Sequence, residues 1–420
     1  MDTDKNRILS PAGDSISVPR IRVHPCSSVV KPAARTSPRF TIDGSDELEQ
    51  HLARACEQVR TEVLALVSAR RLEAILLGGG YGRGEGGVLK TETGDRPYND
   101  LEVYICLSGS QLLNERRYSA ALHTLAQKLS TAVGVDVEFK LVSLRKLRRS
   151  PVSMFYYDLV MGHRGLWGTE DLLAGCAHHC VAEHIPLAEA TRLLMNRCSG
   201  LLFAQEQLQC EPFTPVNADF IGRNLAKAQL ALGDVLLVVG GRYHWSCRER
   251  AQRLRQAGAS VDAADFVLLE DVKTHHLAGM EFKLHPQRTT ASSSSLQKLH
   301  EELSGLALHV WLWLESRRLN CAFHTVRNYA LSPVPKCPET KHWRNCLINL
   351  RTFGPGILFS GQATRYPRER LLEALSLLLW EPETLKSKAL LQRVQRALRT
   401  SGETFPALLE AYRSLWHRFN

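Results

Sequence analysis

The sequence predicts an α+β protein in which a small mixed sheet is followed by a mostly α-helical region. Three observations support this prediction. Residues 45–170 alternate between segments with helical spacing of apolar residues and short apolar runs typical of strands. One run, from Val135 to Leu141, alternates apolar and charged residues, which is typical of a half-buried strand. Beyond Pro151 helical periodicity dominates.

The first elements form a small α/β unit, built around short strands. Its glycine turn starts directly after an apolar run, and an irregular polar stretch is expected from Lys90 to Tyr98. In chain order, we expect a helix over 46–67, a strand over 74–77, a strand over 100–107, a helix over 111–132 and a strand over 135–141.

The remaining elements are predicted to be mainly helices, apart from a strand-like or loop segment over 165–168. The expected helices span 154–161, 186–209, 217–239, 296–319, 368–380 and 384–399. We divide the chain into a disordered, basic, proline-containing tail (1–44), an α/β domain (45–170), a helical domain (171–288), a serine-rich linker (289–296) and a C-terminal helical domain (297–420).

Composition limits the classes of function. No apolar run approaches the roughly 20 residues that cross a bilayer, and the N-terminus lacks the order of a secretory signal. We therefore expect a cytoplasmic protein with no membrane partner. The net charge of +10 is modest for 420 residues and is not gathered into one arm, so we do not expect nucleic acid as a partner.

The most informative segment is the glycine turn, residues 79–86, with the sequence Gly-Gly-Tyr-Gly-Arg-Gly-Glu-Gly. Asp100 and Glu102 follow it on the next predicted strand. Because strand side chains alternate between faces, these two carboxylates would project from one side. Paired carboxylates favour a cation, and a turn rich in backbone N–H groups favours phosphate oxygens. The combination predicts a site for a metal ion and a triphosphate.

Two other glycine-rich motifs fit less well. Residues 82–87 match the G-x-G-x-x-G dinucleotide fingerprint, but no long helix opens directly from this turn. A P-loop needs Gly-Lys-Ser or Gly-Lys-Thr, which does not occur at the turn. We set both motifs aside.

Residues 79–86, followed by Asn-Asp-Leu-Glu at 99–102, resemble the signature of the DNA polymerase β-like nucleotidyltransferase superfamily, with a minimal, aminoglycoside-type core. The resemblance covers about residues 47–167, and it implies that the α/β domain is catalytic. Two departures stand out. The loop from Gly87 to Asn99 is longer than in minimal members, and Gly80 stands where serine is commoner.

The resemblance implies roles for individual residues. Magnesium, or manganese in its place, would be held as a pair of ions by three carboxylates: Asp100, Glu102 and, on the later strand, Asp136. Glu138 shares a face with Asp136 and is an alternative third acid or a general base, and spacing does not separate these two. The nucleotide would be bound by Gly79, Gly80, Arg83 and, from the helical region, Lys227 with Tyr243.

The implied reaction is transfer of a nucleoside monophosphate, AMP from ATP, onto a hydroxyl of a small molecule or of a protein side chain, with release of pyrophosphate. The alternative is a catalytically silent regulatory or nucleotide-binding protein that keeps the transferase fold. The sequence does not specify the acceptor.

Overall fold

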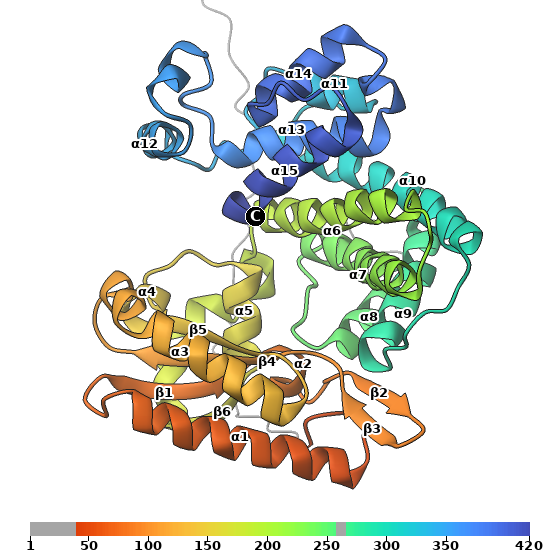
Figure 1. Ribbon diagram of the computed structural model, residues 1–420. Helices are drawn as coiled ribbons and strands as arrows, with labels where there is room; N and C mark the ends of the chain where they lie inside the picture. The colour runs from red at the N-terminus through yellow and green to blue at the C-terminus, as the bar shows by residue number, and fades with distance from the viewer. Residues whose placement is uncertain (1–38, 258–265) are drawn as a thin grey trace, which may run out of the picture. The chain divides into compact units, whose positions relative to one another are not determined.

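The computed structural model describes residues 39–257 and 266–420 (Figure 1). The predicted α+β class is confirmed: a small mixed sheet precedes a mostly helical region. Of the predicted tail, residues 1–38 lie outside the described part of the chain. The rest of it is folded, because Phe40 is buried and its carbonyl oxygen accepts a hydrogen bond of 3.0 Å from the N–H of Gly86.

The α/β part contains six strands and five helices among the described residues. Ser45 caps the first helix, where its hydroxyl accepts from the N–H of Leu48, and three acids in the first turn favour the same start. The elements are α1 (Asp46–Leu66), β1 (Leu72–Leu77), α2 (Gly79–Gly82), β2 (Val88–Thr91), β3 (Gly94–Pro97), β4 (Leu101–Leu107), α3 (Gln111–Val133), β5 (Val137–Ser143), α4 (Leu144–Leu147), α5 (Met154–Met161) and β6 (Arg164–Gly168).

The main sheet has the order β5-β4-β1-β6. Strand β1 pairs antiparallel with both β4 and β6, whereas β4 and β5 are parallel. A parallel pair needs a crossover, and α3 supplies it between β4 and β5. The parallel register sets the two acid-bearing strands side by side.

Each face of the sheet has its own apolar core. Side chains of α1 and α3 pack against one face, where Ile75 and Ile105 are fully buried. The opposite face carries Leu76, Tyr104 and Cys106, which pack against α4 and α5. The charged side chains discussed below belong to this second face.

The polar stretch from Lys90 to Tyr98 is not irregular, as the sequence suggested. It is a β-hairpin formed by β2 and β3, which pair antiparallel. The short strands carry few apolar residues, so their side-chain pattern alone does not reveal pairing.

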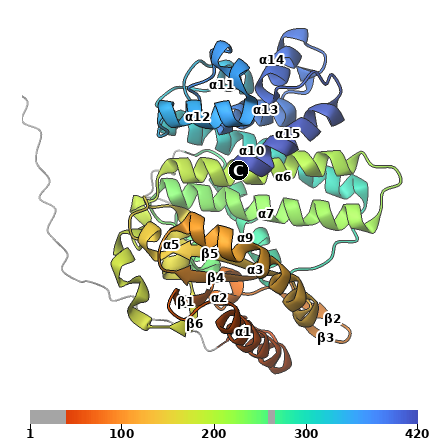
Figure 2. The ribbon, with the colours of Figure 1, turned by 60° about the vertical axis from the view of Figure 1, so that its left-hand side comes forward.

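The helical region follows α5 and β6, and helices α6 and α7 run side by side in it (Figure 2). One continuous apolar core joins helices on both sides of the predicted linker. Ser293 begins α10, so part of the serine-rich stretch is helical, with Ser292 as its N-cap. The helices are α6 (Leu187–Leu208), α7 (Pro215–Val239), α8 (Cys247–Arg255), α9 (Leu269–Leu284), α10 (Ser293–Leu319), α11 (Val326–Leu331), α12 (His342–Phe353), α13 (Pro367–Trp380), α14 (Lys388–Leu398) and α15 (Phe405–Phe419).

Shorter 3₁₀ segments connect several of these elements, at Glu170–His179, Ala182–His184, Pro355–Phe359 and Pro382–Thr384. Among the described residues, none of the helices is long and apolar enough to cross a membrane.

Candidate active site

The glycine turn follows β1 and contacts β4, the strand that carries Glu102. The N–H of Gly78 donates a hydrogen bond of 2.8 Å to the backbone oxygen of Glu102. Gly79 has a φ of +60°, and a Cβ there would lie 2.7 Å from Oε1 of Glu102. A Cβ on Gly78 would lie 2.4 Å from the ring of Tyr104. Glycine is therefore required here by the close approach of the β4 side chains.

The β2–β3 hairpin leaves the turn and returns to it at nearly the same point. The hydroxyl of buried Tyr81 donates to the carbonyl oxygen of Gly87 at 3.0 Å and accepts from the N–H of Tyr98 at 2.9 Å. The side-chain oxygen of Asn99 accepts from the N–H of Gly87 at 2.7 Å. These bonds close the base of the hairpin, so Asp100 lies beside the turn despite the long loop from Gly87 to Asn99.

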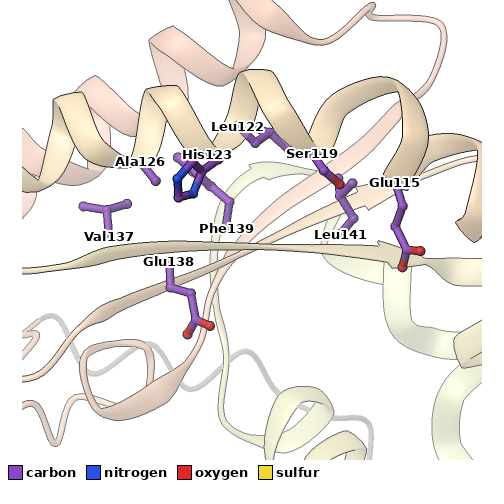
Figure 3. Close-up of a pocket in the computed structure, with 9 residues that line it drawn as sticks. All are labelled: Glu115, Ser119, Leu122, His123, Ala126, Val137, Glu138, Phe139 and Leu141. Carbon is purple, nitrogen blue, oxygen red and sulfur yellow. The ribbon is translucent and has the colours of Figure 1, made fainter. Parts of the chain in front are cut away.

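The acid-bearing strands lie in register. Glu102 of β4 is the partner of Glu138 of β5, and Tyr104 is the partner of Lys140. Glu138 points away from α3, on the side of β5 opposite to Phe139 and Leu141 (Figure 3). The predicted alternation is thus confirmed for Glu138.

Lys140 lies between two of the predicted acids. Its ammonium nitrogen is 3.1 Å from Oε2 of Glu102 and 2.9 Å from Oε2 of Glu138. It also lies over the ring of Tyr104, at 5.6 Å from the centroid, and the Tyr104 hydroxyl donates to Glu102 at 2.7 Å. The sequence placed Lys140 on this face, but nothing in the sequence indicated that it would pair with both glutamates.

Asp136, which the resemblance favours as the third acid, is exposed and precedes β5. Its backbone oxygen accepts from the N–H of Leu101 at 2.8 Å. Within residues 39–257 and 266–420, no three His, Cys, Asp or Glu side chains are placed to hold one metal ion. Of the two alternatives for the third acid, Glu138 is the strand partner of Glu102.

The remaining predicted acid, Asp100, has a pKa above its ordinary value. Although Asp100 is exposed at the surface, partial burial by the surrounding protein is the largest cause, and the negative charges of Glu102 and Glu138 add to it. Burial also acts to raise the pKa of Glu102, but the Lys140 ammonium and the Tyr104 hydroxyl bring it below its ordinary value. The positive charge of Lys140 therefore stabilises the carboxylate of Glu102 more than that of Asp100.

Lys227 reaches this site from α7. Its side chain is exposed, yet burial lowers its pKa, as do the charges of Arg197 and Arg223. The charge of Asp100 acts in the opposite direction, although Lys227 and Asp100 form no ion pair.

Two further cations lie in the same region and were missed by sequence reasoning. Arg197 of α6 and Lys283 of α9 both have a pKa lowered by burial. Among the residues that the structure describes, Arg197, Lys227 and Lys283 have no ion pair or side-chain hydrogen bond. Partly enclosed cations without a carboxylate partner favour an anionic ligand.

Arg83 and Glu85 of the turn contact helices α5 and α8, respectively. The Arg83 guanidinium lies 3.9 Å from the carboxylate of Asp158 in α5. Buried Glu85 accepts hydrogen bonds from the Ser246 hydroxyl and from the N–H of Cys247, the latter at 2.8 Å. Glu85 therefore lies at the N-terminus of α8, beside its N-cap residue Ser246.

Tyr243, which the resemblance implies beside the nucleotide, is buried. Its hydroxyl donates to Asp158 at 3.2 Å and accepts from Arg250 at 3.0 Å. Arg250 in turn lies 2.8 Å from Asp234, to which His276 is also hydrogen bonded. The side chain is thus committed to a buried polar network, so the expected nucleotide contact is corrected to a structural role.

Comparison of the chain with family models, with curated proteins and with solved structures gives no match. Any assignment of function therefore rests on the residues of the turn, of the acid-bearing strands and of the helices that face them.

A groove of about 390 Å³ lies between α3 and β5 (Figure 3). Leu122, Val137, Phe139 and Leu141 line it together with a few polar side chains. Phe139 and Leu141 project from the side of β5 that faces α3, and Glu138, on the other side of the strand, also lines the groove.

Proposed function

We propose that the chain is a magnesium-dependent nucleotidyltransferase that moves a nucleoside monophosphate, AMP from ATP, onto a hydroxyl of a small molecule or of a protein side chain. The observation that carries the proposal is the contact of the glycine turn with Glu102, which is in register with Glu138 and two residues from Asp100. This arrangement agrees with the resemblance to polymerase β-like nucleotidyltransferases. We place this activity in the cytoplasm, with neither nucleic acid nor a membrane as the acceptor.

The chemistry of the donors fits magnesium. Asp100 and Glu102 offer hard carboxylate oxygens, and magnesium commonly takes one or two carboxylates together with water and phosphate oxygens. Glu138 replaces Asp136 as the third acid in the proposal, because it is the strand partner of Glu102. The bound ion would supply neutralisation of phosphate charge.

The chain's own residues would position the triphosphate. Gly79 and Gly80 open α2, where backbone N–H groups lack helical acceptors and suit phosphate oxygens. Lys227, Arg197 and Lys283 supply positive charge, and within the described residues none of the three forms an ion pair. Arg83 is largely committed to Asp158, so we assign it the lesser share of phosphate binding.

A second candidate function is a catalytically silent nucleotide-binding protein. One observation favours it: the Lys140 ammonium already neutralises Glu102 and Glu138, two of the acids that the transfer reaction would use. Such a protein would bind the nucleotide at the same turn without transferring it.

A transfer assay separates the two. The protein is incubated with magnesium, ATP labelled at the α-phosphate and a cell extract as the source of acceptor. The transferase proposal predicts label in a metabolite or protein and release of pyrophosphate, both abolished in Asp100→Ala. It also predicts a larger loss in Glu138→Gln than in Asp136→Asn, the matched change at the acid that precedes β5. Nucleotide binding without either product would instead support the silent protein.

A further inference from the structure

Helix α12 is oriented with its polar side toward the protein. Asn345 and Asn349 are buried. The Asn345 amide donates to the backbone oxygen of Thr364 at 2.9 Å, and the Asn349 amide donates to the backbone oxygens of Ala363 and Arg365, both at 2.7 Å. These bonds fasten the helix to the loop that precedes α13, and so they determine which side of α12 faces outward.

The outward side of α12 is apolar. Trp343 is 60% exposed, Leu347 48% and Leu350 38%. The 3₁₀ segment that follows adds Leu358 at 52% and Phe359 at 92%. Soluble helices normally place such side chains in a core. We refer to these five residues as the α12 surface, and Figure 1 shows α12 set to one side of α13 to α15.

The stretch of sequence that contains the α12 surface is basic. The sequence from Thr340 to Arg368 contains five Lys or Arg residues and no Asp or Glu. Lys341, Arg344 and Arg351 are exposed, and no carboxylate of the described residues lies within ion-pair distance of them. Apolar and basic side chains therefore share one outer surface.

We propose that the α12 surface lies on an anionic lipid bilayer, with α12 parallel to the membrane plane. Trp, Leu and Phe side chains enter the boundary between headgroups and acyl chains, while flanking Lys and Arg contact lipid phosphates. An exposed apolar side alone would also suit a second protein. The run of 29 residues without an acid selects the bilayer, because a negatively charged surface attracts the exposed basic groups of Lys341, Arg344 and Arg351 together.

The proposal goes beyond the transferase activity and does not depend on it. The expectation of no membrane partner rested on the absence of a segment that could span a bilayer. A helix that lies in the interface needs no such length.

Vesicle sedimentation tests the proposal with the full chain. We expect binding to vesicles of phosphatidylcholine with phosphatidylglycerol, weaker binding to phosphatidylcholine alone, and release by added salt. The double variant Trp343→Ser, Phe359→Ser should lower the partition coefficient by about tenfold or more. Each of Lys341→Gln, Arg344→Gln and Arg351→Gln should lower it about fivefold on anionic vesicles.

Leu112→Ser is the matched control, because Leu112 is an exposed leucine on α3, and it should leave binding unchanged. All these side chains are exposed, so the variants should keep the melting temperature of the wild type. Absence of binding to anionic vesicles, or binding that the α12 variants do not alter, would overturn the proposal. So would self-association in lipid-free solution that Trp343→Ser, Phe359→Ser abolishes, since a second copy would then cover the α12 surface.

Discussion

Two features require glycine at position 79: its φ of +60°, and the Glu102 side chain that occupies the space where a Cβ would lie. In Gly79→Ala the new Cβ would meet Glu102, so we expect this variant to lose about 1 to 2 kcal/mol of stability and also to lose metal-dependent nucleotide binding. Chemical denaturation and calorimetry measure the two effects.

Gly134→Ala is the matched control, because Gly134 also has a positive φ but open space at the Cβ position. It should lose similar stability and keep nucleotide binding. Equal nucleotide binding by both variants would show that the contact between the turn and Glu102 has no part in the site.

The Lys140 ammonium forms an ion pair with the carboxylate of Glu102 and another with the carboxylate of Glu138. Lys140→Gln leaves these two carboxylates without their ammonium partner, so we expect about tenfold tighter binding of Mn²⁺ in the absence of nucleotide. Calorimetric titration measures the affinity. The control Lys146→Gln changes an exposed lysine of α4 and should have no effect. Unchanged or weaker Mn²⁺ binding by Lys140→Gln would mean that the lysine does not compete with a cation.

Asp100 makes stability depend on pH in a definite direction. Its raised pKa means that the folded state disfavours the carboxylate, so its contribution is present below the unfolded-state pKa and is lost as the pH rises through the folded-state pKa. We expect Asp100→Asn to be more stable than the wild type near pH 7 and equal to it near pH 3. Denaturant titrations at both values check this, and a less stable variant near pH 7 would contradict it.

At the residue scale, the sequence predicted those features of the site that depend only on the spacing of residues along one strand. Alternation along a strand predicted that Glu138 lies on the side of β5 opposite to Phe139, as is observed. Asp100 precedes β4, so its place on one face with Glu102 stays a prediction. The role of Lys140 could not be predicted, because it depends on the parallel register of β4 and β5, and register is set by tertiary packing.

At the scale of elements, the glycine turn and α8 are coupled through Glu85. The Glu85 carboxylate is buried at the N-terminus of α8 and accepts from two of its first N–H groups, those of Cys247 at 2.8 Å and Arg248 at 3.5 Å. Although burial opposes it, the hydrogen bonds from Ser246 and Cys247 hold the pKa of Glu85 below its ordinary value. The turn is thereby fastened to the helical region.

We expect Glu85→Gln to lower the free energy of unfolding by about 1 to 3 kcal/mol near pH 7. Because the pKa is lowered in the folded state, the wild-type advantage exists above the unfolded-state pKa and is lost as the pH falls through the folded-state pKa. The control Glu92→Gln lies at an exposed position of the hairpin and should be neutral. A difference between Glu85→Gln and wild type that grew toward acid pH would contradict this interpretation.

Most elements with strong periodicity were predicted to within a few residues, including α5 and α13. The β2–β3 hairpin was missed because polar side chains carry little strand signal, and it is held at its base by Tyr81, a residue of the turn. Helix α12 was also missed, although its apolar residues Trp343, Leu347 and Leu350 recur at helical spacing.

At the scale of the whole molecule, the candidate site is shared between two regions far apart in the sequence. The α/β part supplies the turn and the acids, and α6, α7 and α9 supply Arg197, Lys227 and Lys283. Lys227 was predicted from the family resemblance alone. The other two cations could not have been, because a basic residue on a helix has the same pattern whether it faces solvent or a ligand.

The most direct measurement is a crystal structure of the protein with Mn²⁺ and α,β-methylene-ATP, with anomalous diffraction to locate the metal. A transferase-type site predicts a manganese peak within ligand distance of Asp100 and Glu102, with the triphosphate between the glycine turn and Lys227. Nucleotide bound elsewhere, or bound at the turn with no manganese at these two carboxylates, would contradict it.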